Sequence, residues 1–177
     1  EMLEDVIRSD IAYVGDFHTL DKAKATLCVL LQQMLKRKRN ITVAIELVRA
    51  KHQQSLDRYI VGELTETGFL RKINYTSEWG APWSYYKPIF ELAKISNGVI
   101  KLIGIDSNRD GYGCHLRDYL AAKTISRETI ANPERMAIAF MGDLHIARQH
   151  FPEKTNRQLA IYGENKKSVI IYQNRSD

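Results

Sequence analysis

Cysteines and long apolar segments are scarce in this sequence. Its 177 residues include only two cysteines, Cys28 and Cys114, which do not form a Cys-x-x-Cys pair, so a disulfide scaffold and a structural zinc site built on cysteine are excluded. No apolar run reaches the roughly 18 residues that a membrane span needs, and no secretory hydrophobic segment stands at the start. Because the first residues resemble a processed chain, the missing leader does not indicate a cytoplasmic protein.

The net charge of the chain is also small. The chain has 26 basic and 21 acidic residues and a net charge of +5, and much of the excess lies at residues 36–39, which read Lys-Arg-Lys-Arg. Such a run is typical of the solvated end of a helix, where exposed carbonyls favour cations. Contact with an anionic partner is the alternative. Since no aromatic residues are interleaved with these cations, we expect no nucleic-acid partner.

Hydrophobic residues make up 44% of the chain, enough to bury the core of one domain, which we place at residues 1–177. Short apolar runs at 11–14, 41–47, 99–105, within 138–145 and at 168–172 are typical of buried strands, and segments with helical spacing lie between them. This alternation predicts an α/β fold of three layers, in which a mostly parallel sheet is flanked by helices on both faces. We expect residues 51–73 to be helical with interruptions at Gly62 and Gly68, and a helix from residue 146 to end at Pro152.

One short sequence occurs twice. Residues 11–18 read Ile-Ala-Tyr-Val-Gly-Asp-Phe-His, and residues 138–145 read Ile-Ala-Phe-Met-Gly-Asp-Leu-His. A single copy would be weak evidence, but two copies near opposite ends of one domain predict two parallel strands that bring a carboxylate and an imidazole to the same place. We expect the glycine of each copy to let the backbone turn sharply where the strand ends.

Four of the predicted strands end in ionisable side chains. In an open parallel sheet the carboxyl ends of the strands lie along one edge, and ligands bind in the crevice outside them. Any one such side chain is better explained as a helix cap or a satisfied loop residue, but four strand ends, two of them near-identical, favour a common site. These residues are Asp16, His18, Glu46, Asp106, Asp143 and His145. The remaining histidines, His52, His115 and His150, are expected to be surface or packing residues.

These residue types also indicate a chemistry. Two imidazoles with carboxylates are suitable ligands for Zn, Mn, Co or Fe, and we predict His18, Glu46 and His145 as the metal ligands. Asp16 and Asp143 would complete this metal site by orienting the ligands or by capping helices. A metal with an open position can activate water while a carboxylate acts as general base. Glu46, His18 and His145 are therefore also the predicted catalytic residues of a hydrolase.

The motifs, taken in order, resemble those of a known family. They run from Gly-Asp-Phe-His through Ala-Ile-Glu-Leu, Trp-Gly-Ala-Pro-Trp and Gly-Ile-Asp-Ser-Asn to Arg-Asp and Gly-Asp-Leu-His. Over roughly residues 5–152 the sequence is similar to the ChaN-like haem-binding lipoproteins. These belong to a superfamily with the Tiki proteases and the erythromycin esterases, whose shared signature is a pair of Gly-x-x-His motifs and a glutamate. Asp16 stands where many relatives have glutamate.

The resemblance implies haem binding and iron acquisition at the bacterial envelope, by a lipid-anchored protein of the periplasm or outer membrane whose anchor would lie in a segment absent from this chain. It implies Tyr85 or Tyr86 as the axial ligand of haem iron, with Trp79 and Trp83 as flat apolar contacts. For each aromatic residue core packing is the alternative. Arg117 would pair with a haem propionate or, equally, with a strand-end carboxylate. A homodimer and a cytoplasmic location both stay open.

Three functions are therefore compatible with the sequence. The first is a haem-handling or iron-handling protein of the bacterial envelope, which follows from the resemblance. The second is a metal-dependent hydrolase, a protease or an esterase, which follows from the convergence of His18, Glu46 and His145. The third is an interaction domain that has lost both activities.

Overall fold

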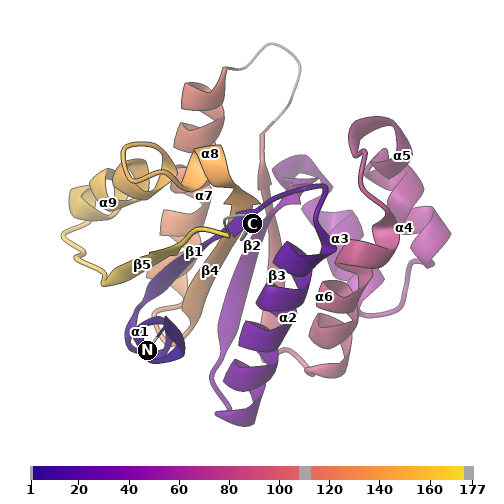
Figure 1. The fold of residues 1–177 in the computed structure, drawn as a ribbon, viewed down its shortest axis with the longest axis horizontal. Coiled ribbons are helices and arrows are strands. Elements are labelled where there is room, and N and C mark those ends of the chain that lie inside the picture. The colour runs from indigo at the N-terminus through magenta and orange to yellow at the C-terminus, as the bar shows by residue number, and fades with distance from the viewer. Residues whose placement is uncertain (1, 108–112, 174–177) are drawn as a thin grey trace.

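Five strands form one sheet in the computed structural model, which describes residues 2–107 and 113–173. The strands are β1 Ile11–Asp16, β2 Ile41–Arg49, β3 Ile100–Asp106, β4 Met136–Gly142 and β5 Ser168–Ile171. Their order across the sheet is β3-β2-β4-β1-β5, and every neighbouring pair is parallel. The predicted α/β fold is thus confirmed, and the parallel pairing extends to all five of these strands (Figure 1).

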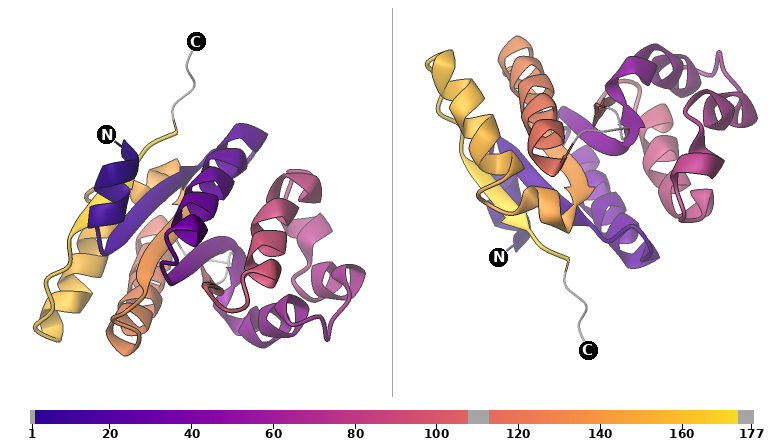
Figure 2. Two further views of the ribbon diagram at one scale, coloured as in Figure 1. Left: turned by 90° about the horizontal axis from the view of Figure 1, so that it is seen from below. Right: turned by 90° about the horizontal axis from the view of Figure 1, so that it is seen from above.

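Helices cover both faces of the sheet (Figure 2). They are α1 Met2–Arg8, α2 Asp21–Lys36, the 3-10 turn η1 Ala50–His52, α3 Gln53–Ile60, α4 Glu66–Lys72, α5 Tyr75–Glu78, α6 Trp83–Ile95, α7 Cys114–Ala131, α8 Asp143–Ile146 and α9 Phe151–Ile161. α2, α3, α4 and α6 contribute to the core on one face, and α7 and α9 to the core on the other. Within the described residues, no helix combines the length and apolarity that crossing a membrane requires.

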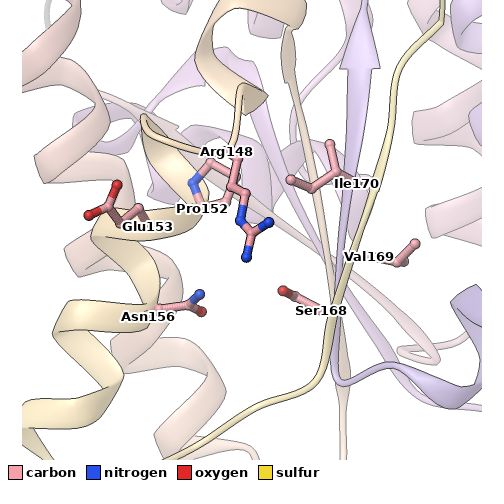
Figure 3. A pocket seen from close by; sticks show the side chains of 7 residues that line it. All are labelled: Arg148, Pro152, Glu153, Asn156, Ser168, Val169 and Ile170. Carbon is pink, nitrogen blue, oxygen red and sulfur yellow. The ribbon is translucent and has the colours of Figure 1, made fainter.

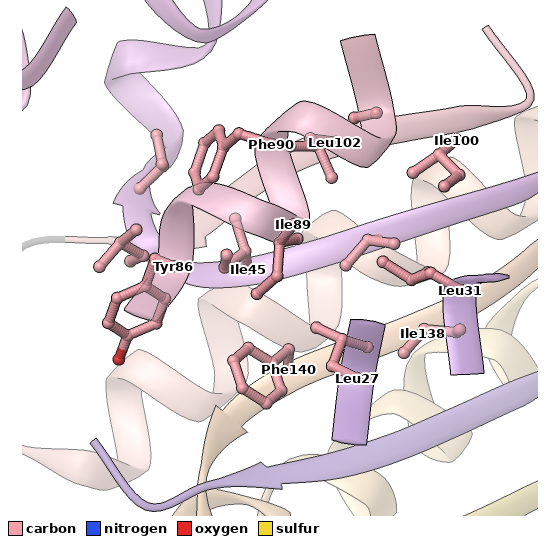
Figure 4. Close-up of a cluster of buried hydrophobic side chains, with 14 of the residues drawn as sticks. Leu27, Leu31, Ile45, Tyr86, Ile89, Phe90, Ile100, Leu102, Ile138 and Phe140 are labelled. Carbon is pink, nitrogen blue, oxygen red and sulfur yellow. The ribbon is translucent and has the colours of Figure 1, made fainter. Parts of the chain in front are cut away.

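The face under α2 and α6 holds the larger apolar cluster. Leu27 of α2 lies near Phe140 of β4 and Leu31 lies nearer to Ile138, while Phe90 and Tyr86 of α6 lie on the same side of the sheet (Figure 4). Each of these side chains is at most 1% exposed, and such burial supplies the main favourable term in folding. The Tyr86 ring is part of this cluster, but its hydroxyl lies at the edge of the cluster and points away from it (Figure 4).

The opposite face is covered by α7 and α9. Ala121 and Ala122 of α7 are fully buried against the sheet, and their small side chains permit the helix to approach it. Phe151 of α9 meets Tyr13 of β1 edge to face, with ring centroids 5.3 Å apart. The two faces together bury both sides of the central strands, which explains why these strands read as continuous apolar runs and not as alternating ones.

Two local predictions were wrong. Pro152 does not end a helix but lies in the first turn of α9, where a missing backbone N–H costs no helical hydrogen bond and the fixed φ of proline suits the helix. Gly62, with φ of +82°, follows α3 as predicted, but Gly68 lies inside α4 and not at a break. Its N–H donates to the hydroxyl of the N-cap Thr65 at 3.1 Å, so it belongs to the helix start.

Candidate functional site at the carboxyl edge of the sheet

Glu46 lies at the centre of a polar cluster at the carboxyl ends of the strands. The pairing of β2 with β3 shifts register between Ile45 and Arg49, so Glu46 lies in the irregular part of its strand, and it is only 4% exposed. Its Oε1 accepts from Arg117 Nη2 at 2.6 Å, and its Oε2 accepts from the Gly142 N–H at 2.9 Å. The side chain is therefore buried and held at both oxygens.

The two motif histidines flank this carboxylate. His18 Nε2 lies 3.7 Å from Glu46 Oε2, and His145 Nε2 lies 3.7 Å from Glu46 Oε1. The structure thus brings together the three residues that the strand-end argument selects. The His18 side chain is 39% exposed and that of His145 only 9%, so one imidazole is open to solvent and the other lies inside.

Each imidazole is oriented by a second carboxylate through its Nδ1. His18 Nδ1 donates to Asp16 Oδ2 at 2.9 Å, and His145 Nδ1 donates to Asp118 Oδ1 at 2.5 Å. Such pairs fix the ring and leave Nε2 to face the ligand. Asp118 was not among the predicted site residues, since it lies within α7 and far from any strand end. Its one sequence signal is the Arg-Asp pair of the family resemblance, and its full burial is visible only in the structure.

Asp118 also contacts a histidine outside the motifs. Its Oδ2 lies 3.3 Å from His150 Nδ1, and the His150 side chain is 40% exposed. His150 is therefore a surface residue, as predicted, but one that shares a buried carboxylate with His145. Of the other two histidines, His52 is half-buried and His115 is exposed.

The pKa shifts differ between the first motif, with Asp16, and the second motif, with His145. Burial by itself would raise the pKa of Asp16, but the hydrogen bond and charge of His18, with hydrogen bonds from Lys24 and Tyr86, lower it overall. Burial would lower the pKa of His145, but the hydrogen bond to Asp118 and the charge of Glu46 raise it overall. The surroundings of the first motif thus stabilise the Asp16 carboxylate, and those of the second raise the pKa of the His145 imidazole.

The sheet register explains why the two motif copies differ. Asp16 pairs with Gly142 across β1 and β4, and not with the corresponding Asp143. Because strand side chains alternate between faces, an offset of one residue turns equivalent positions to opposite faces of the sheet. Asp16 therefore meets α2 and α6, whereas Asp143 shares the space in front of Gly15 with Ile146, which belongs to the core of the other face.

The motif glycines make room for the opposite motif. A Cβ on Gly15 would lie 1.7 Å from Asp143 Oδ1, and a Cβ on Gly142 would lie 3.2 Å from His18 Nε2 and 3.6 Å from Glu46 Oε2. Neither glycine has a positive φ, so the passage from β4 into α8 directly after Gly142 does not depend on a left-handed backbone. Each glycine is needed for close approach, and its missing side chain is replaced by a polar group from elsewhere in the site.

Asp143 is the least satisfied carboxyl group of the cluster. Its Oδ1 is buried and has no hydrogen-bond partner among the described residues. Burial and the nearby charge of Asp16 raise its pKa above the ordinary value. Asp143 therefore does not orient His145, a role that Asp118 performs, and it does not pair with the cations of the site.

Arg117 was predicted to pair with a haem propionate or with a strand-end carboxylate, and in the structure it pairs with two strand-end carboxylates. Its Nη2 binds Glu46, and its Nε donates to Asp106 Oδ1 at 2.9 Å. The two carboxylates raise the pKa of the guanidinium despite its burial, and its side chain is 15% exposed. Both of these partners are strand-end carboxylates, so Nε and Nη2 of the guanidinium are directed at the site itself.

The aromatic residues assigned to haem divide into two groups. Trp83 packs among core rings, with Phe90 at 4.9 Å between centroids, and the Tyr86 hydroxyl is buried and donates to Asp16 Oδ2 at 2.6 Å. The Tyr86 hydroxyl is thus occupied, whereas Trp83 is half-buried. Trp79 lies edge-on to His18 at 5.1 Å, at the site but only 8% exposed. Tyr85 is half-buried.

A pocket opens between the two motif loops. Its volume is about 320 Å³, and its lining comprises Asp16, Phe17, His18, Thr19, Gly142, Asp143, Leu144 and His145. Phe17 is 39% exposed and Leu144 is 80% exposed, so the residue between Asp and His in each motif places an apolar side chain at the mouth. A larger cavity of about 680 Å³ lies between α9 and β5, beside Arg148 and Glu153 (Figure 3), and none of the predicted site residues lines it.

The geometry gives no support to the predicted divalent metal. Among residues 2–107 and 113–173, no group of three His, Cys, Asp or Glu side chains is arranged to hold a metal ion. The physical reason is that Glu46 is already bound by Arg117 and the Gly142 amide. The pairing of Nδ1 with a carboxylate in His18 and His145 does not oppose a metal, because it leaves Nε2 to face a ligand, so the obstacle is Glu46 alone.

Comparisons with known proteins agree with this fold. Residues 2–111 match the family described as haem-binding uptake, Tiki superfamily, ChaN. A search of curated proteins gives no match. Among solved structures, ChaN of Campylobacter jejuni, described as showing cofacial haem binding, is 14% identical with a TM-score of 0.62, and the match covers 99% of this chain and 86% of that chain.

Bacterial toxin domains share the same architecture. The effector domain RRSP of a Vibrio vulnificus toxin is 20% identical with a TM-score of 0.54, over 81% of this chain and 30% of that chain. The C-terminal region of Pasteurella multocida toxin, described as having a thiol-protease like catalytic triad, is 15% identical with a TM-score of 0.56, over 81% of this chain and 20% of that chain. At these identities the likeness concerns the fold alone.

Proposed function

Because the chain belongs to the family of haem-binding uptake proteins of the Tiki superfamily, ChaN, we propose that it binds haem at the pocket between the two motif loops. The observation that carries the proposal is the apolar mouth of this pocket, where Phe17 and Leu144 are 39% and 80% exposed. Exposed apolar side chains that meet around a polar cleft mark binding sites. A flat apolar ring bearing charged groups suits such a surface.

Two residues are available as an axial ligand of the haem iron. The His18 imidazole is 39% exposed and lines the pocket. Its Nδ1 is held by Asp16, so Nε2 is the nitrogen left for iron. Tyr85, which the family resemblance implies, is half-buried on α6 and does not line the pocket, so it would supply a phenolate only to a haem that extends beyond the pocket. Tyr86, the other tyrosine implied by the family resemblance, would first have to break its buried hydrogen bond to Asp16.

Haemin titration followed by the Soret band tests this proposal. The wild-type protein is expected to give a saturable Soret shift. The double variant Phe17→Ser and Leu144→Ser is expected to weaken binding by about tenfold or more, and Val61→Ser, which changes a 69% exposed apolar residue elsewhere, serves as the matched control. The absence of a Soret shift in the wild type, or equal affinity of the double variant and the control, would count against haem binding at this pocket.

The ligand is identified by two single variants in the same titration. If His18 binds iron, His18→Gln changes the position of the Soret band and Tyr85→Phe does not. If Tyr85 binds iron, the outcome is reversed. A band that neither substitution alters would show that the iron is bound elsewhere.

A second candidate, acid–base hydrolysis, is favoured by the placement of Glu46 between two imidazoles. The raised pKa of His145 suits it to donate a proton, while Glu46 and His18 offer acceptor atoms close to it and to each other. Hydrolysis of a peptide or ester panel that Glu46→Gln abolishes, with the fold intact by circular dichroism, would establish it. Activity that survives Glu46→Gln would rule the cluster out as the cause.

We further propose that the protein acts in iron or haem acquisition at the bacterial envelope, held there by a lipid anchor outside this chain. This extends the family resemblance and has a direct test. The full-length native protein is expected in the membrane fraction after cell breakage, and to be released by detergent and not by high salt. Recovery in the soluble cytoplasmic fraction would contradict it.

A further inference from the structure

Lys24 is buried beside the first motif, although lysine is among the residues least often fully buried. It is 1% exposed and lies in the first turn of α2, just after the loop that carries Phe17 and His18. Helical side chains lean toward the N-terminus of their helix. The ammonium group of Lys24 therefore reaches back into the loop that precedes the helix.

Four oxygen atoms surround this ammonium. It donates to the backbone carbonyls of Phe17 at 2.9 Å, His18 at 2.8 Å and Leu20 at 3.1 Å, and it forms an ion pair with Asp16 Oδ1 at 2.6 Å. An ammonium has three donors and no acceptor, and here they meet carbonyls from three positions of one short loop. A single side chain thus satisfies the backbone of the loop from within.

The same ammonium is connected to the ring of His18. Asp16 uses its Oδ1 for Lys24, and its Oδ2 accepts from His18 Nδ1 at 2.9 Å and from the Tyr86 hydroxyl at 2.6 Å. The Tyr86 ring lies 4.7 Å from the Lys24 nitrogen. Lys24 therefore holds the backbone of His18 directly and its imidazole through Asp16.

The second motif is supported in a different way. His145 lies in the short helix α8, and its ring is held by Asp118 of α7. Neither of these contacts involves α2. The two imidazoles that face Glu46 are thus positioned by independent supports, and His145 provides an internal control for any change made at Lys24.

We propose that Lys24 is the positioning residue of the first motif, which holds Phe17 at the mouth of the pocket and turns His18 toward Glu46. The consequence for ligand binding rests on the proposed function, because it requires that the ligand meets these two side chains. The consequence for the loop itself does not. Without the ammonium, the three carbonyls lose their shared donor and the loop can leave this conformation.

The test compares Lys24→Met with Lys22→Met, which changes an exposed lysine of the same helix. Lys24→Met leaves the Asp16 carboxylate buried without its cation, which endangers folding. A second variant therefore combines Lys24→Met with Asp16→Asn, which removes the charge and keeps an acceptor for His18. Circular dichroism establishes that each variant folds.

Two measurements follow on the folded variants. Ring ¹⁵N NMR without ligand is expected to show altered or broadened signals for His18 and unchanged signals for His145, and haemin affinity is expected to fall about tenfold. Unchanged His18 signals, equal changes at both histidines, or failure of the double variant to fold would each overturn the proposal. If the wild type does not bind haemin, the proposed function fails, and the NMR comparison still decides the role of Lys24.

Discussion

The close approach of the two motifs predicts the effect of a single methyl group at Gly15. This residue lies within β1 and has no positive φ, so its backbone suits alanine, and a glycine-to-alanine change at such a position by itself stabilises by about 0.4–1 kcal/mol. The added Cβ, however, would lie 1.7 Å from Asp143 Oδ1 and 3.2 Å from Ile146 Cδ1. One of these side chains must move.

The expected loss for Gly15→Ala follows from that contact. Overpacking of a filled site costs about 1–3 kcal/mol, and because the nearest atom is the end of a half-buried side chain that can rotate away, we expect the lower end, about 1 kcal/mol. For a protein of this size that corresponds to a fall of about 2–4 °C in Tm. Thermal and urea unfolding measure it, with Gly80→Ala as the control, since no atom lies within 4 Å of a Cβ there.

A double variant isolates the cause. Combining Gly15→Ala with Asp143→Ala removes the side chain that the new methyl group meets, so the destabilisation by Gly15→Ala should shrink by about 0.5 kcal/mol or more in that background. The reasoning is refuted if Gly15→Ala is as stable as Gly80→Ala. It is also refuted if the loss is the same with and without Asp143, because the close approach would then not be its source.

Three further predictions concern the charged cluster. Folding raises the pKa of Asp143 from its ordinary value of 3.8, so ionisation of this carboxyl group opposes folding as the pH rises above that value. Asp143→Asn should therefore raise Tm more at about pH 7 than at about pH 4. An equal gain in Tm at both pH values would contradict this. Arg117→Met should cost about 3–5 kcal/mol in urea unfolding, since it leaves Glu46 buried and unpaired; a loss under 1 kcal/mol would argue against the pair. Tyr86→Phe should cost about 1.5–3 kcal/mol by losing its hydrogen bond to Asp16, with the haemin Soret band unmoved, and a moved band would make Tyr86 the iron ligand.

Much of the site could be predicted because strand ends carry positional information. Continuous apolar runs with β-branched residues identified the strands, and parallel pairing places all their carboxyl ends at one edge. Glu46, His18 and His145 follow from this argument without any knowledge of side-chain contacts. Their convergence depends only on sheet topology, which the alternation of strands and helices indicates in advance.

Residues supplied by helices could not be predicted in the same way. Asp118 and Lys24 are charged residues in otherwise ordinary helical segments. Helical spacing shows on which face of its helix each residue lies, but not which groups of the protein that face contacts. The aromatic residues show the same limit. Trp83 and Tyr86 are of the residue types that line haem pockets. In the structure, however, the Trp83 ring packs against Phe90, and the Tyr86 hydroxyl donates to Asp16.

The repeated Gly-Asp-X-His motif shows what each level decides. The sequence by itself determined that two strands end in the same groups and that these groups meet at one edge. Only the tertiary structure decided that the copies play different parts, because β1 and β4 pair with an offset of one residue and the side-chain period of a strand is two. Asp16 therefore holds His18, whereas Asp143 turns to the other face and leaves His145 to a carboxylate from α7.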